Sequence, residues 1–400
     1  MSAQLAGRSL AYKRALGNFP SSAAALVRCA PFSAAALARG SPSSAAVSQS
    51  PTVARGASPA FAMPTSSGVW PWPFASSPPF VPAGAGDSNI HKPLPDKREY
   101  RYLKLANRMR VVLVHDPKAD KAAAALSVNI GHLSDPFELP GLSHFLEHML
   151  FLGTDKFPDE SGYKKYLKDH GGASNASTSA EATTYHFQVH HAFLPEALAR
   201  FCAFFTGPLF TESATERELN AVNSENARNL SLDGRRDLQV GKHLAGEGSV
   251  WRKFGTGDMT TLRTRPAAAG IDVRAALLEH YKRFYSANLM TLSVLGRAPL
   301  DELERMVTGA AVDAGCGVAS DFGAVPDTRQ HESAPLHVGA PPGWARHAYQ
   351  RAQLARNVYI TPVKDTRSLS ISWPVPSPEL PDYARPTRLL AHLFGHEGGK

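Results

Sequence analysis

The chain has 400 residues, roughly two to three domains of ordinary size, and its 43% hydrophobic content excludes a wholly disordered protein. Three cysteines are too few for a disulfide framework and suggest a reducing compartment, and no apolar run is long enough to span a membrane. The net charge of +8 comes mainly from residues 1–86, which hold six basic and no acidic residues, so the nearly neutral remainder argues against a nucleic-acid-binding surface.

Residues 1–86 are dominated by Ala, Ser, Pro and Gly, with scattered Arg. Such a composition buries too little apolar surface to offset the entropy lost on folding. An arginine-rich, serine-rich and acid-poor leader is typical of an organellar transit peptide. We therefore interpret residues 1–93 as a disordered leader and expect import into a mitochondrion or a plastid. An untargeted tail on a cytoplasmic protein is the alternative.

The pattern of strands and helices predicts the fold class. Two strand-like runs around Asn107 and Arg108 predict a hairpin, and the apolar run 122–133 predicts a further strand. A helix is expected to open after Pro140, with Ser143 as a candidate cap. Farther along, helices are predicted at 159–169, 194–205, 212–230, 273–285 and from Pro299, and strands at 173–190 and 290–295. Strands in runs with helices between them predict an α+β sandwich with an antiparallel-rich sheet.

The remaining segments suggest a boundary and a second domain. Residues 94–321 are predicted to form the first domain, and the Pro-, Gly-, His- and Arg-rich residues 322–357 a linker. A strand-like run at 368–376 and the start of a helix at 386–400 follow. Since one strand and one helix cannot make a domain, we interpret residues 358–400 as the incomplete beginning of a second one.

The most informative motif is the sequence HFLEH at 144–148. On a helix, positions i and i+4 lie on one face, so His144 and His148 can bind one metal ion together. This arrangement fits zinc with an open position for water, and Glu147 is a candidate general base. Two surface histidines beside a solvated glutamate are the alternative. The surrounding run GLSHFLEHMLFLG is apolar, and unpaired polar groups would be costly there.

A catalytic zinc site needs a third protein ligand. Glu218 and Glu225 are seven residues apart on the helix predicted at 212–230, so they share one helical face. We choose Glu225 as the ligand and Glu218 as the residue that orients a ligand histidine. Glutamates on exposed helices are usually only solvated, and the spacing by itself leaves that alternative open.

Several segments in order resemble the insulysin and pitrilysin subgroup of the M16 zinc metallopeptidases. They extend from about residue 95 to residue 400 and include GLSHFLEHMLFLGTDKFPDE, HGGASNASTSAEATTYHF, RELNAVNSENARN, WRKFGTGDMTTL, FYSANLMTLSVLGRAPLDELE and LLAHLFGHEGG. The resemblance implies that the chain corresponds to the N-terminal portion of such a protein. It also implies an M16-type α/β sandwich at 94–321 and a truncated second M16 domain.

The resemblance implies a zinc endopeptidase that uses a metal-activated water. It places zinc on His144, His148 and Glu225, a supporting glutamate at Glu218, and the general base at Glu147. The peptide substrate is expected to bind as an added strand along the edge that contains Asn175 and Ala176, although sequence alone would favour an ordinary strand or turn there. Ser177 replaces the aromatic residue that insulysins usually carry, so a side-chain subsite is expected to be smaller or more polar.

Insulysins are considerably longer, and their C-terminal half supplies an Arg and a Tyr that bind substrate and stabilise the oxyanion. We therefore expect this chain to bind zinc but to cleave peptides poorly or not at all without a C-terminal half or a homologous partner subunit. An organellar presequence-processing subunit is one alternative. A non-catalytic scaffold with the M16 fold is another, although the retained ligands favour catalysis. No nucleic-acid partner is expected.

Overall fold

The computed structural model describes residues 90, 92–310, 319–328, 348–349, 351–372 and 392–393. The chain divides into two compact units, and all of the described residues up to Thr366 belong to the larger one. The elements below belong to this larger unit. The predicted leader lies outside the described residues except for its last few positions. Among the described helices, none is long and apolar enough to cross a membrane.

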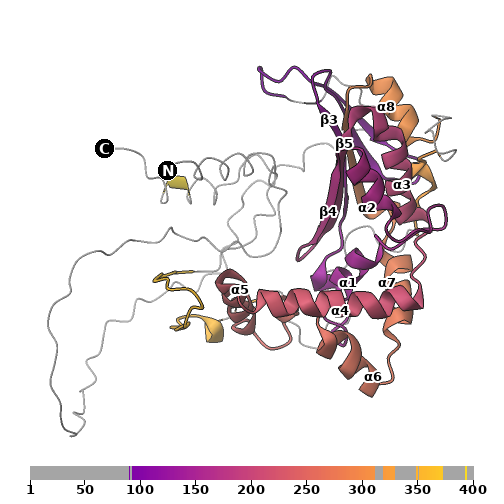
Figure 1. Ribbon diagram of the computed structural model, residues 1–400. Coiled ribbons are helices and arrows are strands. Elements are labelled where there is room, and N and C mark those ends of the chain that lie inside the picture. Colours follow the sequence, from indigo (N-terminus) through magenta and orange to yellow (C-terminus); the bar gives the residue numbers. More distant parts are fainter. Residues whose placement is uncertain are drawn as a thin grey trace, which may run out of the picture. The chain divides into compact units, whose positions relative to one another are not determined.

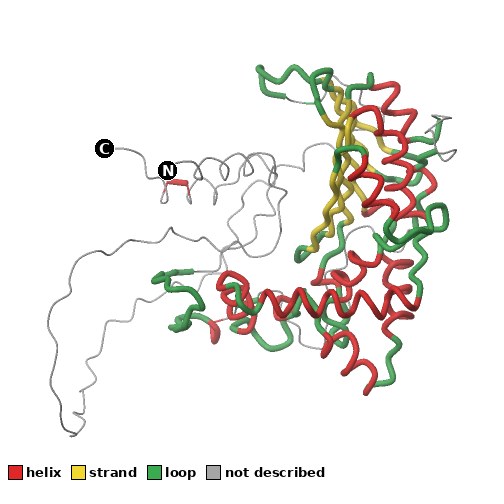
Figure 2. The backbone as a smooth tube through the Cα atoms, in the orientation of Figure 1, coloured by secondary structure: helices red, strands yellow, loops and turns green. Residues whose placement is uncertain are grey.

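A six-stranded sheet forms the centre of the larger unit, in the order β1-β2-β6-β3-β5-β4 (Figures 1 and 2). The strands are β1 (Glu99–Lys104), β2 (Arg110–His115), β3 (Lys121–Val128), β4 (Ala173–Thr178), β5 (Thr183–His190) and β6 (Met290–Gly296). Neighbouring strands are antiparallel except for β2 and β6. The predicted α+β class with an antiparallel-rich sheet is confirmed. The strand β4 occupies one edge of the sheet.

Helices pack on one face of the sheet and at one end of it. They are α1 (Leu142–Met149), α2 (Gly162–Asp169), α3 (Leu194–Thr206), α4 (Glu212–Asn229), α5 (Asp233–His243), α6 (Arg265–Ala268), α7 (Val273–Phe284) and α8 (Leu300–Val307). In Figure 1, α2, α3 and α8 lie beside the sheet, whereas α1 and the long α4 lie together near the end of β4. This second group positions the site described below.

The core forms where the sheet meets α3. Alternate residues of β3 are buried, as expected for a strand with one face on the core. On the neighbouring strand, Tyr185 and Phe187 contact α3, with ring centroids 5.5 Å from Phe205 and 5.2 Å from Phe201. Each buried aromatic side chain contributes about 1.5–3 kcal/mol relative to an exposed one. These contacts hold β5, and through it the edge strand β4, against the helical layer.

The structure differs from the sequence predictions at three places. The helix α5 was not predicted, because DGRRDLQVGKH contains two glycines and few apolar residues. The core of the first domain extends past residue 321, its predicted end, because Phe322 and Val325 are buried in the same core as the sheet residues. In the run predicted as a strand at 368–376, residues 368–372 have irregular backbone, and the others lie outside the described part.

Candidate metal centre

The helix α1 carries the HFLEH motif, and its beginning is fixed by a residue outside it. Asp135 accepts hydrogen bonds from the backbone amides of Gly141 and Ser143, at 2.8 Å each. The Ser143 hydroxyl also donates to this carboxylate, at 2.6 Å. The prediction of Ser143 as the cap was therefore wrong: Ser143 lies inside the helix, and buried Asp135 satisfies the free amides instead.

A close approach between two glycines connects α1 to the FGTG loop at 254–257. Gly141 has a φ of 95°, which favours glycine, and a Cβ atom there would lie 2.3 Å from the Gly257 Cα atom. Any larger residue would push this loop away from the helix. The approach matters for the site because Thr256, next to Gly257, contacts a motif histidine.

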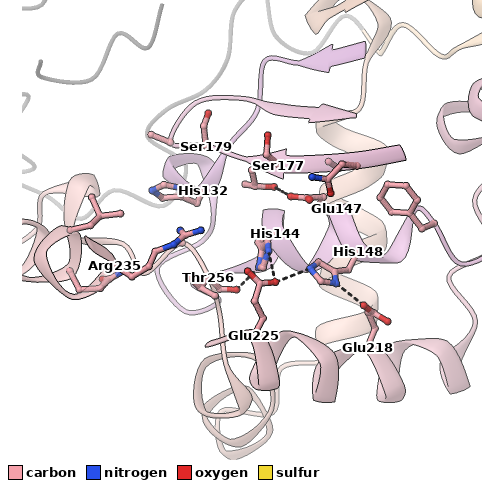
Figure 3. A pocket seen from close by; sticks show the side chains of 18 of the residues that line it. His132, His144, Glu147, His148, Ser177, Ser179, Glu218, Glu225, Arg235 and Thr256 are labelled. Carbon is pink, nitrogen blue, oxygen red and sulfur yellow. Dashed lines mark hydrogen bonds and ion pairs between the residues drawn. The ribbon is translucent and has the colours of Figure 1, made fainter. Parts of the chain in front are cut away.

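Each motif histidine is held by its Nδ1 atom. His144 Nδ1 donates to the Thr256 carbonyl oxygen at 2.7 Å, and His148 Nδ1 donates to Glu218 Oε1 at 2.6 Å (Figure 3). These partners fix the tautomer and the ring orientation, so both Nε2 atoms face away from them. Glu218 thus contacts a motif histidine, in the position that the sequence suggested for it.

Both Nε2 atoms face the same carboxylate oxygen on α4. Glu225 Oε2 lies 3.6 Å from His144 Nε2 and 3.5 Å from His148 Nε2. One potential ligand atom from each of the three residues lies within 4.8 Å of the other two. Ligands of a tetrahedral zinc ion, at about 2.0–2.1 Å from the metal, are separated by roughly 3.4 Å. The donor set and its spacing therefore fit a zinc ion.

The charges of this cluster are strongly coupled. The hydrogen bond with His148 lowers the pKa of Glu225 to about 2 and also lowers the pKa of Glu218. Burial lowers the pKa of His148, but the bonds to the two carboxylates outweigh it and raise the value to about 9. Both glutamates are thus ionised at neutral pH, the state that a metal ligand and its hydrogen-bonded neighbour require, whereas His148 is protonated without an ion and would lose its Nε2 proton when a metal binds.

Glu147 lies between the cluster and the sheet. It is buried, and the Thr178 hydroxyl at the end of β4 donates to Glu147 Oε2 at 2.6 Å. Burial raises the pKa of Glu147, while the bond from Thr178 opposes that shift. A carboxylate with a raised pKa is better suited to accept a proton from water and pass it on. Glu147 lies on α1 beside both histidines, but it is not one of the three residues whose potential ligand atoms lie close together.

The predicted substrate-binding residues lie on the edge strand. Asn175 pairs with His186 and Ala176 pairs with Tyr185, so β4 uses one edge for β5. Its other edge has no strand beside it in the part of the chain that the structure describes. A cavity of about 640 Å³ runs along β4 and includes the three metal-site residues in its lining. Asn175 and Ser177 are exposed there, and Ala176 is half-buried.

Two protein-family profiles match the chain. Residues 110–248 match the family described as Insulinase (Peptidase family M16), and residues 272–400 match the one described as Peptidase M16 inactive domain. The chain belongs to the M16 peptidase family.

Two named relatives each match more than three quarters of this chain. An insulin-degrading enzyme from Drosophila melanogaster is 48% identical over 313 residues, which is 78% of this chain and 29% of the relative. A Schizosaccharomyces pombe relative whose name contains the words "zinc protease" is 41% identical, over 76% of this chain and 29% of its own length. The crystal structure of pitrilysin superposes with a TM-score of 0.58 at 34% identity, covering 68% of this chain and 26% of pitrilysin. The chain thus spans less than a third of the length of these proteins.

The tertiary structure adds residues around the candidate site that were not predicted from the sequence. Thr256 and Thr178 contact the motif helix from distant segments, and Asp135 contacts its first turn from the loop just before it. The FGTG loop lies within WRKFGTGDMTTL, one of the segments that resemble the family, but no site residue was predicted in it. Its two glycines were the signal available for a close backbone approach. The residues of α5 that line the cavity were also not predicted, because the helix itself was not predicted.

Proposed function

We propose that this chain contains the zinc-binding catalytic domain of an M16 endopeptidase of the insulysin type. The observation that carries the proposal is the pair of Nε2 atoms, from His144 and His148, that face one oxygen of Glu225. Both Nδ1 atoms already have partners, so the Nε2 atoms are the ones directed at an ion. Similarity to insulin-degrading enzymes and to a relative named as a zinc protease supports it.

The proposed chemistry divides between the metal and the chain. When bound, zinc supplies Lewis acidity that polarises a peptide carbonyl and makes a water molecule more acidic. Glu147 accepts the proton of the attacking water and later donates it to the leaving amine. Thr178 keeps the Glu147 carboxylate directed at the cavity through its hydrogen bond. Glu218 keeps the ring of His148 in place.

The peptide is proposed to bind along the open edge of β4. Backbone groups of an edge strand without a partner strand can add an extended peptide through main-chain hydrogen bonds. Asn175 and Ala176 lie on this edge, and Thr178, the last residue of the same strand, contacts the proposed base. A peptide paired with β4 would therefore pass directly above Glu147.

We further propose the domain organisation expected from the sequence, with the first domain extended to include buried Phe322 and Val325. The catalytic domain then begins at 94 and ends beyond 321, the rest of 322–357 is a linker, and a second M16 domain begins at 358–400. The strand β6 lies between β2 and β3 in the sheet, which supports assigning residues 272–321 to the catalytic domain. A C-terminal half or a homologous partner subunit is proposed to complete the active site.

For residues 1–93 we propose that they direct import into a mitochondrion or plastid. A fluorescent protein fused behind these residues tests this, and fluorescence that stays in the cytoplasm would contradict it.

Zinc content and peptide cleavage together test the proposal. We expect the wild-type chain to bind one zinc ion, Glu147→Gln to keep zinc but lose activity, and Glu225→Gln to lose zinc. Glu216→Gln is a matched control, because Glu216 lies on the same helix and pairs with Arg263 outside the cluster. Zinc is measured by elemental analysis after dialysis, and cleavage with a quenched fluorescent peptide. Retained activity in Glu147→Gln, or retained zinc in Glu225→Gln, would contradict the assigned roles.

A presequence-processing subunit is the second candidate, favoured by the acid-poor leader. Cleavage of a presequence peptide only after addition of a partner subunit would support it. A non-catalytic scaffold is the third candidate. It predicts that neither the wild type nor Glu147→Gln cleaves peptides, with or without zinc.

A further inference from the structure

One face of α5 forms the wall of the cavity opposite the edge strand. Arg235, Leu238, Gln239 and Lys242 all line the cavity, and their spacing of three and four residues places them on the same helical face. The neighbouring Arg236 is directed elsewhere, since its guanidinium donates to Asp233 and to the Thr361 carbonyl oxygen. The cavity therefore receives one arginine and one lysine from this helix.

Most charged groups in the cavity already have a partner. Glu218 and Glu225 contact the motif histidines, and Glu147 accepts a hydrogen bond from Thr178. Lys242 is buried and donates to His132 Nε2 at 2.8 Å and to the Lys253 carbonyl oxygen at 2.9 Å. These contacts leave little freedom for the buried lysine to bind a second group.

Arg235 differs from these residues. Its side chain is exposed, extends from α5 into the cavity (Figure 3), and makes no hydrogen bond or ion pair with the residues that the structure describes. It is close enough to lower the pKa of Glu225 through its charge, without an ion pair between them. A guanidinium with unused donors in a cavity is suited to bind a carboxylate through two parallel hydrogen bonds.

The strand on the other side of the cavity leaves room for such a carboxylate. Asn175, Ser177 and Ser179 are small or medium-sized polar residues, and all are exposed at the cavity. A peptide added to β4 would direct alternate side chains to opposite faces. Side chains on one of these two faces would then point towards α5.

On this basis, and resting on the proposed peptidase function, we propose that Arg235 determines specificity by binding an acidic side chain of the peptide substrate. The bound side chain is one that projects from the β4-paired peptide towards α5. The alternative is that Arg235 only balances the charge of Glu225. The two differ in a measurable way, because charge balance would affect zinc binding and all peptides equally, whereas recognition depends on the peptide side chain.

The test uses the zinc-loaded Glu147→Gln chain, which holds peptides without cleaving them. Binding is measured by fluorescence anisotropy for extended peptides of equal length, in which a single Glu, Gln or Lys is moved through successive positions. We expect Glu to be preferred over Gln by about tenfold at one position and not at its immediate neighbours. Arg235→Gln should abolish that preference and Arg235→Glu should shift it towards Lys, whereas Arg236→Gln, on the same helix outside the cavity, should leave it unchanged.

The outcomes separate this proposal from the proposed function. Peptide binding without a charge preference, or a preference that Arg235→Gln retains, would overturn the role of Arg235 and leave the peptidase assignment in place. A uniform loss of affinity for every peptide in Arg235→Gln, with weakened zinc binding, would favour charge balance and also overturn it. If zinc binds but no peptide does, both proposals fail. Loss of zinc binding in the wild-type chain would contradict the proposed function and, with it, the role of Arg235 that rests on it.

Discussion

At the scale of single residues, the candidate site depends on how each histidine ring is oriented. An imidazole can present either nitrogen to a metal, and the partner of the other nitrogen decides which one is free. Thr256 and Glu218 provide these partners from two different segments. The backbone carbonyl that holds His144 cannot be removed by mutating a side chain, whereas Glu218 can be changed. The role of Glu218 can therefore be tested directly by mutation, whereas the role of the Thr256 carbonyl cannot.

Replacing Glu218 with Gln should weaken zinc binding without abolishing it. The amide can still contact His148 Nδ1, but it lacks the charge that raises the basicity of the ring. Losses of this kind are about 10–100-fold in metal affinity. The measurement is a competition titration against a zinc-binding dye, with Glu216→Gln as the control on the same helix. An unchanged zinc affinity would show that Glu218 does not support the ligand.

At the scale of secondary-structure elements, the helix α1 is short and depends on contacts outside itself. It spans Leu142–Met149, and helices of such length are unstable in isolation. Its first turn is stabilised by Asp135, and its beginning packs on the FGTG loop. Lys253, from the segment that precedes this loop, also donates to the Leu133 and Asp135 carbonyl oxygens. Helix and loop are thus held as one assembly that positions both histidines.

Asp135→Asn should destabilise this assembly. The amide has a single oxygen for the amides of Gly141 and Ser143 and adds donors that face other donors. We expect a loss of about 1–3 kcal/mol in the free energy of unfolding, because a buried polar group is left without a partner. Urea unfolding measures it, and Asp116→Asn at the Lys118 turn is the control. Equal stability of the two variants would contradict this role of Asp135.

At the scale of the whole molecule, the chain contains the candidate zinc site but spans only 29% of the length of its Drosophila relative. The cavity is bounded by β4 and α5 within the larger unit. The proposed chemistry also requires donors that stabilise the oxyanion. Loss of one such donor typically lowers the rate by about 10²–10³-fold. We therefore expect zinc binding and full activity to be separable in this protein.

Adding the C-terminal part of a relative in trans should raise activity. We expect the purified chain to bind zinc and to cleave a quenched peptide slowly. Addition of the remaining C-terminal part of the Drosophila relative should increase kcat/KM by about 100-fold or more. The Glu147→Gln chain with the same addition is the control and should stay inactive. Robust cleavage by the chain alone would contradict the need for a second half.

Local patterns in the sequence were sufficient for the fold class and for the helix pair that carries the site. The spacing within HFLEH depends only on the helical repeat, and so does the seven-residue separation of Glu218 from Glu225. The contribution of Asp135, Thr178, Thr256 and Arg235 was decided only by the tertiary structure. These residues belong to a turn, a strand end, a loop and a helix that contains two glycines, and their local sequence does not identify the side chains that they contact. Thr178 and Thr256 meet the motif helix across 31 and 112 residues of chain. Such contacts arise only when the sheet and the helices pack, which is why a periodic pattern cannot reveal them.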